Sequence, residues 1–262
     1  MLRAERQAEI LSMLTEAGSR IVSISDLSQT LCVSAMTIRR DLETLEEQGL
    51  VRRVRGGAMH AESPLLFELS FRDRAREHHE QKAAIGREAA KLVKDGQVII
   101  LDAGTTTLEV SRHIQARKVT AVTSALPVAI ELAAHEEVSA ILLGGNLKAP
   151  ELCTVGPMTT ESLSHLAADI LFLSASGFSP ERGVSDPDLR EAEVKQAMMR
   201  AARRVVLVAD SSKYEAVTFA LVAPMGEVGV LVTDTGLPQA GKAAIEALGV
   251  EVVLAELGSD GR

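Results

Sequence analysis

The chain has 262 residues, of which 46% are apolar and 24% charged, so it can bury a full hydrophobic core in one or two domains. Aromatic residues make up only 2%, which excludes an aromatic stacking platform for single-stranded nucleic acid. The net charge of −8 does not exclude DNA binding. Residues 1–60 hold eight basic and eight acidic side chains, so the whole excess falls in residues 61–262, and a phosphate backbone responds to local charge.

The two cysteines, Cys32 and Cys153, lie far apart and outside any metal-ligand spacing. This pattern argues for a reducing compartment and against a disulfide framework or a zinc site. The N-terminal residues lack the apolar stretch of a signal peptide, and no apolar run is long enough to cross a bilayer. We therefore expect a cytoplasmic protein with no membrane partner, no metal and no cofactor.

The first sixty residues predict three short helices followed by a hairpin. Apolar residues at helical spacing predict a helix over 3–17, and the β-rich residues 21–24 predict a short strand. Ser25 is the expected N-cap of a second helix, and Ser34 is the expected N-cap of a longer third helix that ends before a glycine. Residues 50–59 predict two strands around a turn that contains glycine.

The helix after Ser34 has two distinct faces, because Ile38, Leu42 and Leu45 form one apolar stripe at 100° per residue. Two helices joined by a tight turn, with a polar face on the second, are typical of a helix-turn-helix whose second helix enters the major groove. The basic hairpin would then grip the DNA backbone or minor groove as a wing. The alternative is an interaction module in which Arg39 pairs with Glu43. The residues expected to contact DNA are Ser34, Met36, Thr37, Arg39, Arg40, Arg52, Arg53 and Arg55.

Apolar strands alternate with helices in the rest of the chain, after a linker and connecting helix at 61–80. The expected strands are 98–102, 119–123, 140–143, 170–174, 205–209, 228–233 and 250–254, and the expected helices are 105–115, 127–134, 157–166, 189–201 and 238–248. This alternation predicts a mostly parallel sheet covered by helices on both faces. We therefore expect a head over 1–60, an α/β domain over 81–257 and a disordered tail at 258–262.

Three polar turns follow three successive strands of the expected sheet. Residues 102–107 (Asp-Ala-Gly-Thr-Thr-Thr) bring backbone N–H groups and hydroxyls to a helix start, which is a ready anion site. Thr123-Ser124 and Gly144-Gly145 follow the next two strands. Because all three lie at carboxyl ends of strands, they are placed where open α/β sheets bind ligands. Taken alone, the threonine-rich turn has a simpler explanation as a helix cap, and Gly144-Gly145 has one as a plain turn. Residues 102–106 are also similar to the phosphate loop of actin-like ATPases and sugar kinases.

For two lysines expected near the carboxyl edge of the sheet, the sequence allows either a ligand contact or an ordinary surface role. Lys195 lies one helical turn after Glu191, so a plain surface ion pair is the alternative to a ligand contact. Lys213 follows the strand at 205–209, which aims it at the carboxyl edge, although a lysine there is as often solvated.

Taken in order, these motifs resemble those of the DeoR family of bacterial transcriptional repressors. The resemblance rests on residues 34–42, 45–50 and 53–58 in the head and on residues 102–107, 144–145, 191–198 and 209–213 in the second half. It implies a winged helix-turn-helix joined to a sensor domain that binds sugar phosphates and is similar in fold to ribose-5-phosphate isomerase and CoA-transferases. The residues expected to contact the effector are Asp102, Gly104, Thr105, Thr106, Thr107, Thr123, Ser124, Gly144, Gly145, Lys195 and Lys213.

Catalysis by the sensor domain is disfavoured by one segment. Sugar-phosphate isomerisation needs a carboxylate base, and the isomerase relatives carry an acidic residue near 170–178, where this chain has Ser176 before Gly177. We therefore expect a regulator and not an enzyme, namely a repressor of a carbohydrate-metabolism operon controlled by a phosphorylated sugar. The alternative is a sugar-phosphate isomerase or transferase with an accessory DNA-binding head. A single winged helix reads few base pairs, so we expect a homo-oligomer on repeated or palindromic half-sites of double-stranded operator DNA.

Overall fold

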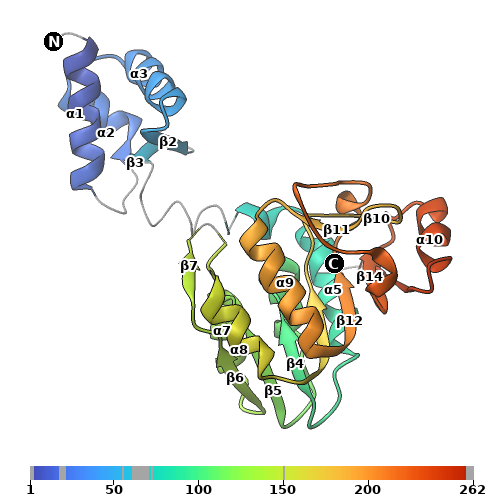
Figure 1. The fold of residues 1–262 in the computed structure, drawn as a ribbon. Coiled ribbons are helices and arrows are strands. Elements are labelled where there is room, and N and C mark those ends of the chain that lie inside the picture. The colour runs from blue at the N-terminus through green and yellow to red at the C-terminus, as the bar shows by residue number, and fades with distance from the viewer. Residues whose placement is uncertain are drawn as a thin grey trace, which may run out of the picture. The chain divides into compact units, whose positions relative to one another are not determined.

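The computed structural model describes residues 3–17, 22–54, 56–60, 71, 73–149 and 151–257. The chain forms two compact units, Met1–Arg72 and Asp73–Arg262 (Figure 1). Most of the expected linker and the whole expected tail lie outside the described residues. Within those residues, no helix combines the length and the apolar character that a membrane span requires.

Over the described residues from 3 to 60, the first unit consists of three helices and a three-stranded antiparallel sheet, as predicted. Its elements are α1 (Arg3–Glu16), β1 (Val22–Ser23), α2 (Ile24–Thr30), α3 (Ala35–Glu47), β2 (Val51–Val54) and β3 (Gly57–His60). The sheet order is β1-β3-β2. Helix α2 begins earlier than expected because Ser23, and not Ser25, is its N-cap, with Ser23 Oγ accepting the Asp26 N–H at 3.0 Å. The predicted cap of α3 is confirmed, since Ser34 Oγ accepts the Thr37 N–H at 3.2 Å.

A buried ion pair joins α1 to α3 inside this unit. Asp41 is only 2% exposed and pairs with the Arg6 guanidinium. Replacing Asp41 by alanine is expected to remove about 2 kcal/mol from the stability of this unit, because a charge-assisted hydrogen bond is lost and Arg6 is left without its carboxylate. Amide hydrogen exchange in α1 should then accelerate about 30-fold at neutral pH. The control is Glu43→Ala, which removes an exposed carboxylate and should leave exchange in α1 unchanged. Equal exchange in both variants would contradict a stabilising role for Asp41.

The second unit is built on a seven-stranded sheet in which every neighbouring pair is parallel. All seven strands expected from the sequence are present in it. They are β4 (Val98–Leu101), β5 (Val119–Thr123), β6 (Val138–Leu142), β9 (Ala168–Leu173), β12 (Ala202–Val208), β14 (Val230–Asp234) and β15 (Glu251–Ala255), in the order β15-β14-β12-β9-β4-β5-β6.

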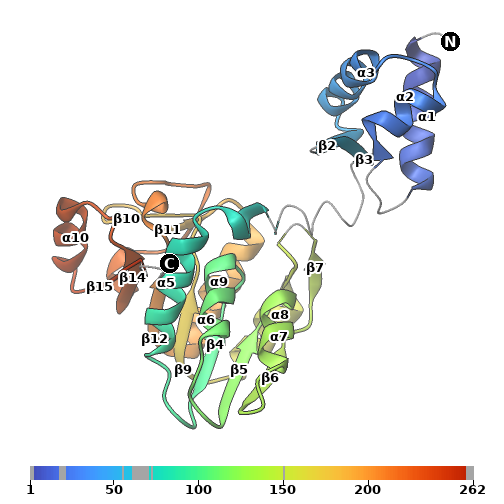
Figure 2. The same ribbon diagram turned by 180° about the vertical axis from the view of Figure 1, so that it is seen from behind.

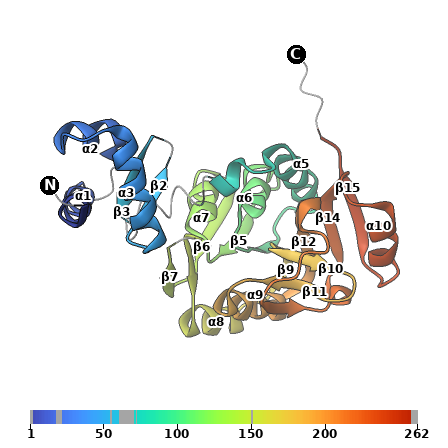
Figure 3. The same ribbon diagram turned by 90° about the horizontal axis from the view of Figure 1, so that it is seen from above.

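Helices cover both faces of this sheet, as Figures 2 and 3 show. On one face lie α5 (His79–Ala90), α6 (Thr105–Arg112) and α7 (Leu126–Ala133), and on the other lie α8 (Pro157–Ser164) and α9 (Leu189–Ala201). Helix α10 (Gln239–Glu246) packs beside β15. The five predicted helices are therefore confirmed, with ends that differ by up to three residues. Helix α5 is not predicted as a separate element, because its first residues, His79 and Glu80, fall inside the predicted linker and connecting helix at 61–80.

Several short elements escape the sequence prediction. Strands β10 (Gly177–Ser179), β11 (Gly183–Asp186) and β13 (Ala220–Ala223) form a small antiparallel sheet, and β7 (Asn146–Lys148) pairs with β8 (Cys153–Val155). They are three or four residues long, too short for a period of two to show. The expected cover on both faces holds for the central strands, whose side chains are buried, but is wrong for β6, where Ile141 and Leu142 are 42% and 46% exposed. This strand is one of the two edges of the sheet, and β15 is the other.

Candidate functional site

The candidate ligand site lies at the switch point of the sheet, where the order in which successive strands are added reverses. The strands that follow β4 in the chain add first on one side of it, as β5 and β6, and later on the other side, as β9, β12, β14 and β15. The chain leaving β4 and the chain leaving β9 lead to helices on opposite faces of the sheet. The region at the carboxyl ends of β4 and β9, called the crevice below, is the position at which doubly wound sheets bind ligands. The sequence placed the 102–107 turn at this edge, and the structure shows that it is at the switch point itself.

Asp102, the first residue after β4, organises this crevice. Its Oδ1 accepts the Ala103 N–H at 2.7 Å, and its Oδ2 accepts both the N–H and the hydroxyl of Ser174, at 3.0 and 2.7 Å. Lys195, on α9, donates to the same Oδ2 and to Ser174 Oγ. Asp102 and Lys195, which the sequence predicted separately, are thus brought into direct contact across the switch point.

Lys195 is held as a buried cation. It is 2% exposed, and its Nζ also lies 3.6 Å from Asp186 Oδ2. Burial alone lowers the pKa of Lys195, but Asp102, Asp186 and Glu191 together raise that pKa above its usual value. Lys195 is therefore not the surface partner of Glu191 that its spacing allowed.

Two buried carboxylates lie near this lysine, of which the sequence analysis named Glu191 only as a surface partner of Lys195 and did not name Asp186. Asp186 comes from β11, and Glu191 from the first turn of α9. The absence of an acidic residue at Ser176 thus does not leave the crevice without carboxylates, because other segments supply them.

A second lysine extends the charged cluster. Lys148, on β7, pairs with Glu191, with Asp188 at 3.0 Å and with Glu151 at 3.2 Å. Burial raises the pKa of Glu191. Burial also acts to raise the pKa of Asp188, but hydrogen bonds from Arg190 and Lys148 outweigh it and lower that pKa. Lys148 was not predicted, because nothing in the short segment around it marks a strand.

The two other predicted turns are largely occupied by structural hydrogen bonds. Thr123 Oγ1 accepts the Ala125 N–H at 3.1 Å, and the Ser124 carbonyl accepts the Thr154 N–H at 2.8 Å. Gly145 has φ 154°, and a Cβ there would lie 2.1 Å from Thr159 Oγ1. The Gly144 carbonyl accepts that same hydroxyl at 2.8 Å. Gly145 therefore permits the close packing of the β7–β8 hairpin and α8.

The space between these turns is small. A cavity of about 10 Å³ is lined by Asp102, Ala103, Ser124, Cys153, Thr154, Val155, Glu191 and Val194. This volume holds no more than one water molecule, so a sugar phosphate needs these side chains to move apart. Burial, with Glu191 and Asp102 nearby, raises the pKa of Cys153 to about 12 and keeps it a thiol.

The start of α6 offers the accessible part of the 102–107 turn. Gly104 and Thr105 are half-buried, whereas Thr106 and Thr107 are buried. Gly104 has φ 157°, and a Cβ there would lie 3.0 Å from Ser174 Cβ, so a larger residue would crowd the crevice. Thr107 Oγ1 donates to the Gly104 carbonyl at 2.9 Å and shapes the turn. Gly104 and Thr105 are therefore the residues of this turn that a ligand can approach.

Lys82, on α5, lies at the same end of the unit and was missed by the sequence reasoning. Helices α5 and α6 pack so closely that a Cβ on Gly86 would lie 2.6 Å from the backbone of Glu109. Lys82 and Thr105 each precede this contact by four residues. Lys82 is buried, and its Nζ donates to the Arg74 carbonyl. Burial lowers the pKa of Lys82, and the charges of Asp210 and Lys213 also act on that pKa. The structure thus brings two lysines, Lys82 and Lys213, toward one edge of the sheet.

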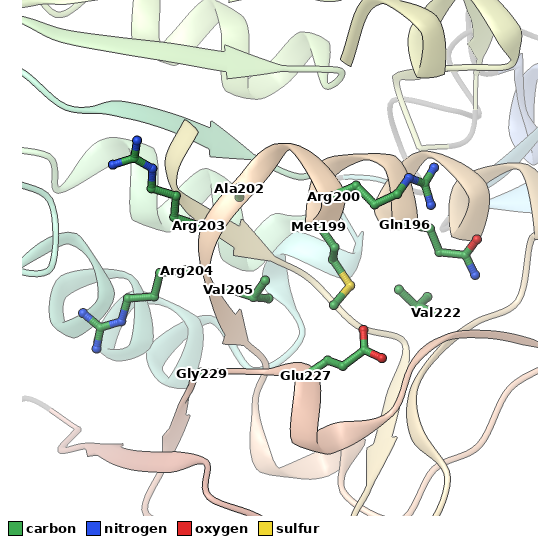
Figure 4. Close-up of a pocket in the computed structure, with 10 residues that line it drawn as sticks. All are labelled: Gln196, Met199, Arg200, Ala202, Arg203, Arg204, Val205, Val222, Glu227 and Gly229. Atoms are coloured by element: carbon green, nitrogen blue, oxygen red, sulfur yellow. The ribbon is translucent and has the colours of Figure 1, made fainter. Parts of the chain in front are cut away.

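A larger cavity, of about 450 Å³, lies at the opposite edge, where α9 ends and β12 begins (Figure 4). Three arginines line it, but Figure 4 shows that the side chain of Arg200 points away from those of Arg203 and Arg204. Arg204 also pairs with Glu251 at 3.3 Å. Because the guanidinium groups do not converge, the cavity is not built as an anion site.

The predicted DNA-reading residues that the structure describes are mostly exposed. Ile38, Leu42 and Leu45 are buried, as the apolar stripe predicted. Residues on the rest of the α3 surface are accessible: Ser34, Met36, Arg39 and Arg40 are exposed and Thr37 is half-buried. Among the wing residues, Arg52 is exposed and Arg55 lies outside the described residues.

The charges of the wing differ from the prediction in one respect. Arg53 Nη1 lies 3.0 Å from Glu43 Oε1, and the Arg53 N–H donates to Glu46 Oε1 at 2.9 Å. Glu43 is thus paired with the wing and not with Arg39, which leaves Arg39 and Arg40 as the principal cations of the α3 surface. Within the described residues, no group of His, Cys, Asp and Glu side chains is suited to hold a metal ion.

Two family models match the two units of the chain. Residues 6–64 match the DeoR-like helix-turn-helix domain, and residues 77–235 match the DeoR C-terminal sensor domain. The HTH-type transcriptional regulator GolR of Listeria innocua is 34% identical over 98% of this chain and 100% of its own. The HTH-type transcriptional repressor GlcR of Bacillus subtilis is 33% identical over 98% of each chain. Among solved structures, ribose 5-phosphate isomerase A of Methanocaldococcus jannaschii aligns with 52% of this chain and 55% of its own, at 19% identity and a TM-score of 0.39.

Proposed function

Since the chain belongs to the DeoR family of HTH-type transcriptional regulators, we propose that it is a repressor of a carbohydrate-metabolism operon and that a phosphorylated sugar controls its binding to operator DNA. The observation that carries the proposal is the α3 surface, where Arg39 and Arg40 are exposed above a buried apolar stripe. The relatives are named transcriptional regulators, which favours this function over an isomerase with an accessory head. The repressor GlcR supports the direction of control.

On the DNA side, α3 enters the major groove and the β2–β3 hairpin follows the backbone. Arginine is suited to the O6 and N7 acceptors of guanine, so Arg39 and Arg40 read bases. The helix start with Ser34 and Thr37 is suited to phosphate contacts, which position the helix without reading sequence. Arg52 acts on the backbone from the wing, and Arg53 acts less because two carboxylates already lie beside it.

On the effector side, the phosphoryl group binds at the start of α6 between Lys82 and Lys213. The N-terminal N–H groups of a helix and its dipole favour an anion, and the two lysines add charge at the same edge. Gly104 and Thr105 are accessible there. The sugar hydroxyls reach toward Ser124 and Glu191, which line the small cavity. Asp102 and Lys195 hold the crevice in shape, because their polar atoms are already bonded to each other and to Ser174.

A thermal-shift screen of the full chain against pentose and hexose phosphates tests this site. At least one compound should raise the Tm, because a ligand at 100 times its Kd adds about 2.7 kcal/mol to stability. Replacing Lys213 by alanine should weaken that compound about 10- to 100-fold, since a charge-assisted hydrogen bond is worth about 1.5–3 kcal/mol.

The matched control is Lys242→Ala, which removes a lysine from α10, away from the switch point, and should leave the response unchanged. A normal response in both Lys213→Ala and Lys82→Ala would remove the proposed phosphate site. A response to no phosphorylated sugar at all would remove the effector class.

A further inference from the structure

The exposed surface of α3 changes its charge along the helix. Arg39 and Arg40 are exposed in its N-terminal half, and Glu43, Glu46 and Glu47 are exposed in its C-terminal half. Two of these glutamates already pair with the wing. Because the phosphate backbone of DNA attracts guanidinium groups and repels carboxylates, only the N-terminal half of α3 is suited to lie against a duplex.

Met36 is a large apolar side chain that lies exposed in this N-terminal half. It is 56% exposed and comes two residues after the N-cap Ser34. The helical period places Met36 opposite the buried stripe of α3 and within about 40° of Arg40 around the helix axis. In the described part of the first unit, Leu50 is the only other large apolar side chain that is exposed, and it lies beyond the acidic half of α3. Met36 therefore adds an apolar group to the part of α3 that faces a duplex.

The position of Met36 distinguishes it from an apolar residue that is exposed without a role. Scattered apolar residues are common on protein surfaces, but the N-terminal residues of a recognition helix are the ones that contact base edges. An apolar protein partner would strip water from the neighbouring Arg39 and Arg40 without replacing its hydrogen bonds. A duplex instead offers those arginines phosphates and base acceptors. DNA is therefore the occupant that suits both the apolar and the charged groups of this surface.

The chemistry of the major groove names the group that Met36 would contact. Among the base edges exposed there, the apolar group is the 5-methyl of thymine. Arg39 and Arg40 only donate hydrogen bonds, so they recognise acceptors such as guanine O6 and N7 and make no use of that methyl. A methionine side chain is unbranched and polarisable, and it adapts its shape to a small apolar group. Met36 thus supplies a contact that the arginines lack and that separates thymine from cytosine.

We propose that Met36 is a specificity-determining residue that packs against the 5-methyl group of a thymine in the major groove, beside the base pair that Arg40 reads. The two residues are one helical turn apart, about 5.4 Å along α3, so the bases that they contact lie within about two base pairs of each other. The inference rests on the proposed function, because it requires α3 to enter the groove. It adds to that function a preference for thymine at one defined position of the operator.

Replacement of thymine by deoxyuridine tests the contact without altering the protein. A preferred duplex is selected from random DNA with the wild-type chain, and its thymines are replaced one at a time. Deoxyuridine lacks the 5-methyl group but keeps every hydrogen-bonding group of the base. Fluorescence anisotropy at one fixed salt concentration should reveal a thymine whose replacement weakens binding roughly 4-fold. That factor corresponds to about 0.8 kcal/mol, the free energy of burying one methylene-sized group.

Two variants assign the effect to Met36. In Met36→Ala the same replacement in the DNA should leave the affinity unchanged, because the methyl group then has no side chain to contact. Leu50→Ala is the matched control, since it removes the other exposed apolar side chain of this unit and should keep the roughly 4-fold effect. Met36 is exposed and alanine favours the helix, so Met36→Ala should keep the wild-type Tm.

The outcomes separate this inference from the proposed function. A wild-type scan in which no thymine responds, or a response of equal size in the wild type and in Met36→Ala, overturns the role of Met36. In either case, a duplex that the wild-type chain binds selectively leaves the proposed function standing. A chain that selects no duplex from random DNA overturns both.

Discussion

Replacing Arg40 by alanine is expected to weaken binding to the preferred duplex roughly 10- to 100-fold and to reduce discrimination among sequences. The reason is geometric, because Arg40 is exposed on α3 while Ile38 and Leu42 anchor the opposite face of that helix. The preferred duplex is obtained by selecting from random DNA with the wild-type chain. Fluorescence anisotropy at one fixed salt concentration then compares this duplex with an unselected one.

Two control variants separate base reading from general charge. Arg40→Lys keeps the positive charge but loses the bidentate fork, so it should lose discrimination and retain the salt dependence of the wild type. Arg53→Ala should weaken binding less than Arg40→Ala, because Glu43 and Glu46 already pair with that guanidinium. An Arg40→Ala chain that binds the selected duplex as tightly as the wild type would show that α3 is not the recognition helix.

Replacing Lys195 by methionine should destabilise the second unit by about 3–5 kcal/mol, because the buried carboxylates Asp102 and Asp186 would lose their cation. For a domain of this size, the Tm should fall by roughly 6–20 °C. The raised pKa of Lys195 means that its contribution is complete below the pKa of an unfolded lysine and is lost only as the pH rises through the folded pKa. The loss is therefore fully measurable at neutral pH, by thermal unfolding followed with circular dichroism.

A double variant identifies the cause of that loss. Adding Asp102→Asn to Lys195→Met removes one of the stranded charges, so the double variant should recover part of the lost Tm. Lys148→Met serves as a comparison, and it should cost less because Lys148 and its carboxylate partners are all less buried than the Lys195–Asp102 pair. An unchanged Tm in Lys195→Met would show that Lys195 does not stabilise the second unit by pairing with Asp102 and Asp186.

The elements with strong local patterns could be read from the amino-acid order. The seven strands of the parallel sheet are rich in apolar residues, and α3 combines a capping serine with a stripe of Ile38, Leu42 and Leu45. The turn at 102–107 carries its own signal, because glycine and threonines follow an apolar strand and begin a helix. These features depend on residues within about ten positions of one another, which is the range over which periodicity and capping act.

The composition of the crevice depends on contacts between distant segments. Asp102 meets Lys195, which is 93 positions away, and Lys148 meets Glu191, which is 43 positions away. Asp186 and Lys82 belong to no motif that can be recognised in the sequence. Only the order of the strands brings each of them close to the switch point. The exposure of β6 could not be read from its sequence, because its five residues include no charge and no proline and so resemble a central strand. Which strands become neighbours is set by the packing of the whole sheet, and local pattern carries no information about it.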